Sequence, residues 1–330
     1  MPETKALEKR IFSITNSLSF NELAVDIFHF QYRNNPVYHQ FVDLLGVNPS
    51  AIRHDTEIPF LPIEFFKDQK VCSGEFEPET IFTSSGTSGQ VNSQHYIKSL
   101  NLYEQSFVTQ FTQQFGAPDN FVLLALLPSY LEREGSSLVY MVEKLIGLTR
   151  DPSSGFYLHN YEQLAQVLNN LKKPSKKVLL IGVTYALLDL AETYPIHFPK
   201  LILMETGGMK GKRKELLRTE MHDILKAAFG IENVCSEYGM TELLSQAYSL
   251  KDGVFEHPPW MKVMIRDMND PLTLLDNGKT GGMNIIDLAN LYSCSFIATK
   301  DLGRKIDDRS FEMLGRYDNS DVRGCNLMIS

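Results

Sequence analysis

Residues 178–183 read Val-Leu-Leu-Ile-Gly-Val, an uninterrupted apolar run. A second run extends from Phe121 to Leu127, and shorter ones lie at Leu201 to Met204 and at Val234 to Cys235. Strands that are buried on both faces have such continuous runs, and parallel sheets are buried in this way. The four segments therefore predict a parallel sheet.

Helical patterns fill the intervals between these runs. Apolar residues recur with helical spacing at Tyr161, Leu164, Leu168 and Leu171, and again at Leu217, Met221, Ile224 and Ala228, with Gly230 placed to end the second helix. Upstream, aromatic residues recur every four positions and are expected in the core: Tyr103, Phe107, Phe111 and Phe115. Strands and helices in alternation predict right-handed βαβ units, whose ligands bind at the carboxyl ends of the strands. The predicted fold class is α/β.

The two ends of the chain differ from this central pattern. The segment Ser19-Phe20-Asn21-Glu22 has capping-box spacing and predicts the start of a helix. Two prolines exclude the segment from Ile58 to Pro62 from a helix interior, so it is expected to join a helical N-terminal region to the sheet. Beyond residue 250, Asp252-Gly253, Asn277-Gly278 and Gly281-Gly282 punctuate shorter apolar runs, which predicts hairpins and a smaller antiparallel subdomain.

Composition excludes several classes of function. The 330 residues carry 32 Lys and Arg against 40 Asp and Glu, a net charge of -8, which argues against nucleic acid or an acidic lipid surface as a partner. The four cysteines form no CxxC pair, so neither a disulfide framework nor a zinc site is indicated. The N-terminus lacks the apolar core of a secretion signal, and the longest charge-free apolar stretch is well short of the ~20 residues that span a bilayer. We expect a cytoplasmic protein without a membrane span.

The segment Thr83-Ser84-Ser85-Gly86-Thr87-Ser88-Gly89-Gln90 combines five hydroxyl residues with two glycines. Glycines let backbone N–H groups converge and hydroxyls add donors, which together form an uncharged cradle for phosphate oxygens. An ordinary surface turn rich in Ser and Gly explains the composition equally well. The segment Gly207-Gly208-Met209-Lys210-Gly211-Lys212-Arg213 is not a Walker loop, because its glycines are one position too close and Arg213 replaces the metal-binding Ser or Thr.

Further polar segments follow later in the chain. Ser236-Glu237-Tyr238-Gly239-Met240-Thr241-Glu242 comes after a predicted strand, and 299–304, 315–318 and 321–325 read TKDLGR, GRYD and DVRGC. Each has a structural explanation when taken alone: Tyr238 as core, Glu242 at a helix start, Asp301 as a turn former and Arg316 as surface charge. Their order and combination are harder to explain structurally.

In this order the motifs resemble those of the adenylate-forming enzymes, the superfamily of acyl-CoA synthetases and luciferases. Residues 58–62, 127–137 and 323–327 look like the acyl-protein synthetases of bacterial luminescence fatty-acid reductase systems. The resemblance covers roughly residues 55–330. Residues 1–55 form the helical N-terminal region that the pattern predicts and lie outside the resemblance, which implies over 56–314 a large domain of the N-terminal type, with parallel sheets and a smaller β-rich subdomain. A hinge-like tail at 315–330 carries Cys325, and the mobile C-terminal domain of the superfamily is truncated.

The resemblance implies a role in phosphate binding for two of the motifs. The β- and γ-phosphates of ATP would be held by Ser84, Ser85, Gly86, Thr87, Ser88 and Gly89. Thr241 would bond the α-phosphate and Glu242 would hold Mg²⁺ through a hard oxygen ligand. The cofactors implied are therefore ATP, as a substrate, and Mg²⁺.

The remaining motifs would bind the nucleoside. Tyr238, followed by Gly239, would stack on adenine, and Gly207-Gly208 would allow the backbone close to the base. Asp301 would accept hydrogen bonds from the ribose hydroxyls, and Arg316 would contact ribose or phosphate.

Three departures from the family pattern have consequences. No lysine or arginine ends the hydroxyl loop, where Gln90-Val91-Asn92 stands, so the pyrophosphate charge must be met by Mg²⁺, backbone donors or a basic residue elsewhere. Lys300 stands where the family has glycine, which would place an ammonium near the nucleotide. Only five residues follow Cys325, so the domain that supplies a catalytic lysine in the superfamily is expected to be missing.

The implied reaction joins a carboxylate, which the resemblance implies is a long-chain fatty acid, to the α-phosphate of ATP and then passes the acyl group to a thiol. Cys325 is the candidate thiol because it lies in a polar, glycine-flanked segment with Arg323 nearby to favour the thiolate. A buried structural cysteine is the alternative, as it is for Cys235 and Cys294, which lie in apolar runs, while Cys72 is undecided. An acyl reductase or a carrier protein would accept the acyl group, and a homo-oligomer is left open.

Two other functions remain open from the sequence. One is an acid–thiol ligase that uses coenzyme A or a carrier protein, and the other is an adenylate-binding scaffold that has lost catalysis. Three further residues could line the acyl site: Ser136, Ser137 and His95. The alternative is a structural role, in which the serines cap a helix or lie on the surface and His95 makes a local hydrogen bond.

Overall fold

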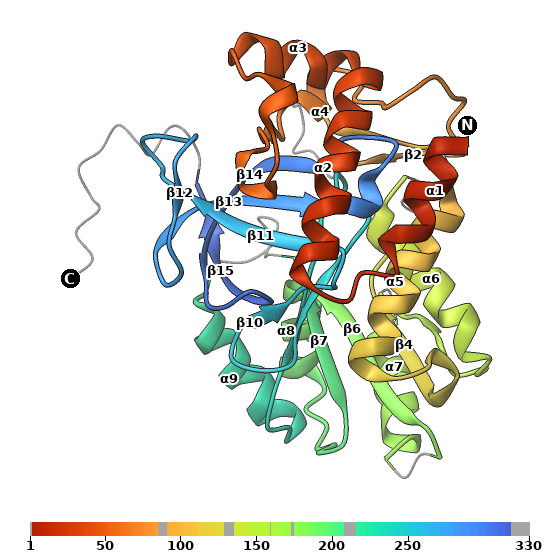
Figure 1. Cartoon of the computed structure of the whole chain (residues 1–330). Helices are drawn as coiled ribbons and strands as arrows, with labels where there is room; N and C mark the ends of the chain where they lie inside the picture. Colours follow the sequence, from red (N-terminus) through yellow and green to blue (C-terminus); the bar gives the residue numbers. More distant parts are fainter. Residues whose placement is uncertain are drawn as a thin grey trace. The chain divides into compact units, whose positions relative to one another are not determined.

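A computed structural model of the chain describes residues 2–84, 91–128, 135–158, 160–172, 175–207 and 216–317 (Figure 1). The chain divides into two compact units. One unit contains residues 76–258, and the other combines residues 1–75 with residues 259–330. The division at residues 55 and 314, which rests on the order of motifs, stays a prediction.

The 76–258 unit is built on a parallel sheet with the strand order β8-β7-β6-β4-β5. Its strands are β4 (Phe121–Leu126), β5 (Gly155–Phe156), β6 (Lys177–Val183), β7 (Ile202–Thr206) and β8 (Cys235–Tyr238). All of β4 is buried, and in β6 only Lys177 is exposed. The four apolar runs thus form parallel strands, as predicted, because both faces of this sheet are covered.

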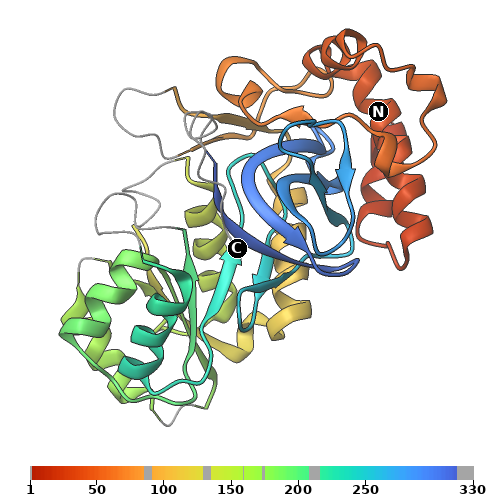
Figure 2. The same cartoon turned by 90° about the vertical axis from the view of Figure 1, so that its left-hand side faces the viewer.

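The covering helices lie on both sides of these strands. They are α5 (Leu100–Phe115), α6 (Ser137–Thr149), α7 (Tyr161–Asn170), α8 (Thr184–Thr193) and α9 (Arg218–Phe229). Figures 1 and 2 show α8 packed with α9 and, apart from them, α5 packed with α6. The rings of Phe111 in α5 and Phe121 in β4 meet edge to face at 5.5 Å, and the four aromatic residues of α5 are buried as predicted.

Two short antiparallel pairings complete the 76–258 unit. β8 continues into β9 (Ala247–Ser249) and β10 (Val254–Glu256), each antiparallel to the strand before it. β2 (Thr80–Thr83) and β3 (Gln94–Ile97) form a separate two-stranded hairpin. The predicted turn at Asp252-Gly253 connects β9 to β10, with both residues at positive φ.

The other unit has an antiparallel sheet in the order β12-β11-β13-β14-β15, with β1 parallel to β14. The strands are β1 (Leu61–Pro62), β11 (Met261–Arg266), β12 (Leu274–Leu275), β13 (Thr280–Asp287), β14 (Phe296–Lys305) and β15 (Ser310–Arg316), and the helices are α1 (Pro2–Ile11), α2 (Ser17–Asn34), α3 (Pro36–Leu44) and α4 (Phe65–Asp68). The buried amide of Gln31 in α2 donates to the carbonyl oxygens of Asn290 and Leu291, each at 3.0 Å. Residues from both ends of the chain therefore share one core, and the predicted β-rich second half is confirmed.

Two local predictions were wrong. α2 begins at Ser17 and is capped by Asn16, while Ser19 is the third helical residue and bonds back to the cap, so Ser19 does not itself start the helix. Gly281-Gly282 lies within β13 instead of a turn. A Cβ on Gly282 would lie 2.7 Å from Cζ of Arg266, a buried side chain that packs across the strand.

Candidate active site

The carboxyl ends of β6, β7 and β8 carry polar residues, as the parallel topology predicts. Thr184 follows β6 directly, and its hydroxyl donates to the carbonyl oxygen of Gly207, which follows β7. The same hydroxyl lies 3.4 Å from Oε2 of Glu205. Gly207 is exposed at φ 68, a conformation that glycine adopts without strain.

The Tyr-Gly-Met-Thr-Glu segment begins at the end of β8. Tyr238 is the last residue of the strand and is buried, with its ring edge-on to Phe255 at 6.0 Å. Glu242 is buried, whereas Thr241 is partly exposed. A Cβ on Gly239 would lie 2.5 Å from Oε1 of Glu237, so only glycine fits there without displacing that carboxyl group.

Glu205, which is buried, and Glu237, which is half-buried, are acidic residues on neighbouring strands of the sheet that sequence reasoning missed. Oγ1 of Thr206 donates to Oε2 of Glu237 at 2.5 Å. Burial nevertheless raises the pKa of Glu237 to about 7, and the neighbouring Glu205 adds to the rise. Burial also raises the pKa of Glu205. A charged residue within an otherwise apolar strand, as in Ile202–Thr206, was the signal available in the sequence.

The two acids point to opposite faces of the sheet. Thr206 is paired with Glu237 and Glu205 with Ser236, and paired residues share a face. Nε2 of His222, on α9, lies 4.0 Å from Oε1 of Glu205 and has no hydrogen-bond partner among the described residues. Burial, together with the charges of Arg218 and Lys226, lowers the pKa of His222 to about 4. The imidazole is therefore neutral near neutral pH.

His95 contacts the Tyr-Gly-Met-Thr-Glu segment from β3. Its Nδ1 lies 2.8 Å from the carbonyl oxygen of Thr241, 146 residues further along the chain. Burial lowers the pKa of His95 to about 4. The structural explanation left open for this residue was a local hydrogen bond; the hydrogen bond is present, but the expectation that it is local was wrong.

The β2–β3 hairpin carries the hydroxyl loop between its strands. Ser84 and Ser93 close its base, because the Ser84 N–H donates to the Ser93 carbonyl at 3.1 Å and the Ser93 N–H donates to Oγ of Ser84 at 2.9 Å. The Thr83 N–H also donates to the carbonyl oxygen of Gly135 at 2.7 Å. The predicted phosphate ligands Ser85, Gly86, Thr87, Ser88 and Gly89 lie outside the described residues, as do Gly208 and Cys325.

Asp301 and Arg316 belong to the unit formed by the two ends of the chain. They lie opposite each other on β14 and β15, and Nε of Arg316 donates to Oδ1 of Asp301 at 2.9 Å. The Asp301 carboxylate is 2% exposed and the Arg316 side chain 71% exposed, so a guanidinium at the protein surface pairs with a buried acid. The ammonium of Lys300 pairs with Glu64 at 3.0 Å.

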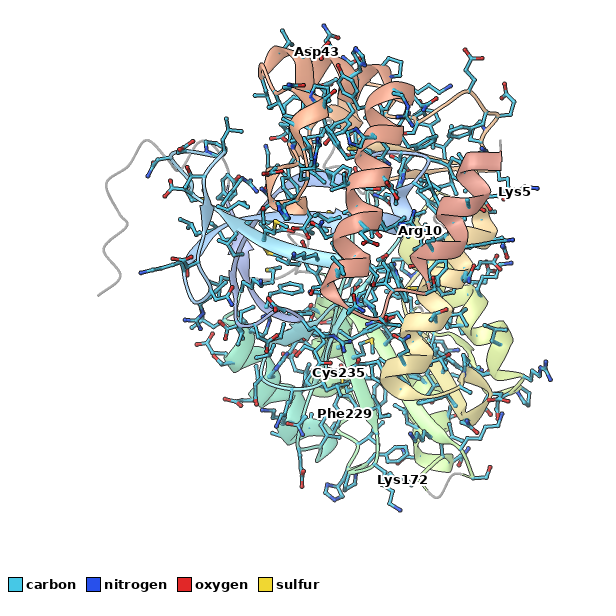
Figure 3. All side chains as sticks on the ribbon, in the orientation of Figure 1. Lys5, Arg10, Asp43, Lys172, Phe229 and Cys235 are labelled. Atoms are coloured by element: carbon cyan, nitrogen blue, oxygen red, sulfur yellow. The ribbon has the colours of Figure 1, made fainter. Side chains whose placement is uncertain are left out.

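The cysteines that the structure describes are buried. Cys235, labelled in Figure 3, is 8% exposed and belongs to the 76–258 unit. Burial raises the pKa of Cys72 and of Cys235 to about 11, and that of Cys294 to about 12. These thiols are protonated at neutral pH and unsuited to nucleophilic attack. Cys235 and Cys294 are core residues, as predicted, and Cys72 is buried as well.

Of the structural roles left open for the two serines, capping is confirmed for Ser136, whereas the surface position is wrong, because Ser136 and Ser137, the first residue of α6, are both buried. Ser136 caps the helix, and its hydroxyl oxygen accepts from the Val139 N–H at 3.4 Å. No helix among the described residues is both long and apolar enough to cross a membrane.

The fold is that of the adenylate-forming enzymes. A structure of 2-hydroxyisobutyryl-CoA ligase in complex with 2-HIB-AMP and CoA matches 93% of this chain and 77% of its own, with a TM-score of 0.70 and 13% identity. ATP-bound MatB of Rhodopseudomonas palustris matches 73% of this chain with a TM-score of 0.55 and 16% identity. The chain covers about half of that protein, 49%.

Sequence comparison shows the family to which the chain belongs. The family described as acyl-protein synthetase, LuxE, matches residues 15–330, and the chain belongs to it. The long-chain-fatty-acid–luciferin-component ligase of Vibrio harveyi is 26% identical over 94% of this chain and 87% of its own length. The chain is therefore a ligase, and the resemblance seen in its motifs is confirmed.

Proposed function

We propose that this protein is an ATP-dependent acyl-protein synthetase that activates a fatty acid as an acyl-adenylate and transfers the acyl group to Cys325. A carboxylate oxygen forms a bond to the α-phosphorus of ATP, and the bond from that phosphorus to the bridging oxygen breaks, which releases pyrophosphate. The Cys325 thiolate then attacks the acyl carbon and AMP leaves, so that a thioester is formed. The V. harveyi relative is named for a long-chain fatty acid, which supports a long-chain substrate here.

The observation that carries the proposal is the position of Thr241 and Glu242. They follow the last parallel strand, β8, at the edge where α/β sheets bind ligands, in a chain of the acyl-protein synthetase family. Thr241 would donate its hydroxyl to the α-phosphate. The exposed Gly207 backbone and Tyr238 would flank the base, with Asp301 on the ribose hydroxyls and Arg316 on ribose or phosphate.

Glu242 fits a magnesium ion held jointly with the substrate. Within the described ranges, no three His, Cys, Asp or Glu side chains are grouped closely enough to hold a metal ion by themselves. Mg²⁺ usually takes one or two protein carboxylates and completes its shell with phosphate oxygens and water. When bound, the ion would neutralise charge that develops on pyrophosphate, and Glu242 would hold it against the phosphates.

Exchange of labelled pyrophosphate into ATP tests the activation step. We expect exchange that depends on an added fatty acid, and we expect Glu242→Ala to abolish it. Glu232→Ala is the matched control, because Glu232 is an exposed glutamate of the same unit. If no acid supports exchange by the wild-type protein, the proposed function is wrong.

Intact-mass measurement tests the transfer step. After incubation with ATP, Mg²⁺ and a series of fatty acids, the wild-type protein should gain one acyl mass, and Cys325→Ser should not. Full turnover of Cys325→Ser with added coenzyme A would instead identify an acid–thiol ligase that uses a free thiol. The acid that gives the fastest labelling defines the chain length.

A further inference from the structure

The β2–β3 hairpin is bonded to two loops at the carboxyl edge of the parallel sheet. On β2, the Thr83 N–H donates to Gly135, in the connection that follows β4. On β3, His95 reaches Thr241, in the connection that follows β8. β4 and β8 are separated by β6 and β7. The hairpin therefore spans this edge of the sheet, and His95 supplies its side-chain link to the segment after β8.

In the hydrogen bond between His95 and Thr241, the histidine is the donor. The imidazole is 1% exposed, and this burial lowers its pKa to about 4. The ring is therefore neutral near neutral pH. A carbonyl oxygen can only accept a hydrogen bond, so the Nδ1 that faces Thr241 carries the ring proton. Nε2 is then the unprotonated nitrogen. The donor end of this bond is buried and the acceptor residue is partly exposed, and a buried N–H left without an acceptor is costly.

The backbone just before Thr241 contains a glycine. Gly239 has no side chain to restrict its dihedral angles, and it immediately precedes Met240 and Thr241. Within the segment, the Leu243 N–H donates to the Met240 carbonyl at 3.1 Å, which closes a turn but leaves the Thr241 carbonyl for His95. The orientation of that carbonyl sets the plane of the peptide that joins Thr241 to Glu242.

We propose that His95 is a positioning residue, which holds the Thr241–Glu242 peptide through its Nδ1–H so that both side chains face the nucleotide. This role rests on the proposed function, because Thr241 and Glu242 act there on the α-phosphate and the metal. His95 itself touches no reacting atom. Its contribution is to tie the segment after β8 to the strand that follows the hydroxyl loop.

Two variants of similar polarity distinguish this role from simple filling of space. In His95→Asn the side-chain amide lies near the position of Nδ1 and can donate to the Thr241 carbonyl, whereas in His95→Gln it lies near Nε2. His95→Leu fills the space without a donor. The control is His257→Leu, because His257 is also buried in this unit and its Nδ1 lies 3.0 Å from the carbonyl oxygen of Pro258.

Amide hydrogen exchange of residues 239–246 and kcat/KM for ATP–pyrophosphate exchange are measured on each full-length variant. We expect His95→Leu and His95→Gln to speed amide exchange in this segment and to lower kcat/KM about tenfold, the effect of one lost buried hydrogen bond. His95→Asn should restore both quantities most of the way to wild type. His257→Leu should leave the segment and kcat/KM unchanged, whatever it does to the melting temperature.

The proposal is overturned if His95→Leu leaves amide exchange in the segment unchanged, or if its kcat/KM falls no further than that of His257→Leu. It is also overturned if Gln restores the wild-type values as well as Asn does, and this comparison holds even where Leu prevents folding. If the wild-type protein shows no pyrophosphate exchange with any acid, the proposed function fails. The amide-exchange result then still decides whether His95 holds the segment.

Discussion

Replacing Glu237 by glutamine should change the way stability depends on pH. Burial raises the pKa of Glu237 to about 7, from 4.5, although Thr206 donates a hydrogen bond to it. The same carboxyl group in the unfolded chain titrates near its ordinary value. Between these two pKa values the native protein binds more protons than the unfolded chain, so the free energy of unfolding falls as the pH rises.

The size of the effect follows from the two pKa values. The difference between about 7 and 4.5 amounts to about 3 kcal/mol at 1.36 kcal/mol per unit. About 2.5 kcal/mol of this contribution to the free energy of unfolding is lost between pH 5 and pH 8. In that range Glu237 is already ionised in the unfolded chain and becomes ionised in the native protein. Glutamine has nearly the same shape, can accept from Thr206 and does not ionise. Glu237→Gln should therefore gain about 2.5 kcal/mol relative to wild type between pH 5 and pH 8.

Urea denaturation at pH 5, 6, 7 and 8 measures this gain directly, provided that wild type and variant share the same m-value. His95 and His222 titrate in both proteins, so their contributions cancel in the difference. The control is Glu232→Gln, at an exposed position of the same unit, which should show no pH-dependent gain. A wild-type-to-variant difference that is the same at pH 5 and at pH 8 would refute the reasoning.

Three further predictions concern the 76–258 unit and the thiols of the whole chain. Gly230→Ala should lower the free energy of unfolding, measured in urea, by about 1–3 kcal/mol. Residue 230 has φ +66, and a Cβ there would lie 2.1 Å from Nδ1 of His197. The control Gly147→Ala, in α6 with open space around it, should raise the free energy of unfolding by up to about 1 kcal/mol. His222 should contribute a loss of stability as the pH falls from 6.5 toward 4, because the unfolded chain binds a proton there that native His222 does not. Over that range the change in melting temperature of His222→Gln should therefore be less unfavourable than that of wild type, and equal changes would contradict this. An aromatic disulfide reagent should label one thiol in the native protein and all four after denaturation, and Cys325→Ser should leave none labelled in the native state, because the other three are buried and protonated.

The parallel sheet was predictable because a strand that is buried on both faces is apolar along its whole length, which a single short segment shows. Every residue of β4 is buried, so Phe121–Leu126 is apolar throughout and needs no knowledge of its partners. Helix starts were less certain, since Asn16 and Ser19 both have capping side chains and only the geometry shows which is the cap. Gly281-Gly282 reads as a turn because the group that leaves no room for a Cβ, the carbonyl oxygen of Arg266 at Gly281 and its side chain at Gly282, lies on the paired strand β11.

The same distinction applies to the candidate site. The Tyr-Gly-Met-Thr-Glu segment was placed correctly at the end of a strand because its position depends on the apolar run immediately before it. The link from His95 to Thr241 depends on tertiary structure, since neither residue's neighbours indicate the other. Likewise, the raised pKa of Glu237 arises from enclosure by groups on several elements, which one strand sequence does not reveal.

The unit formed by residues 1–75 and 259–330 has a consequence for synthesis. β1 pairs with β14, with Leu61 opposite Ile297, so the first helices emerge from the ribosome long before the strands they pack against. At about 10 residues per second, the delay is about 20 s. During that interval the aromatic face of α2, including Phe28, has no β14 to cover it and is a natural target for chaperones. The 76–258 unit has all its strands in one continuous stretch and can complete its folding first.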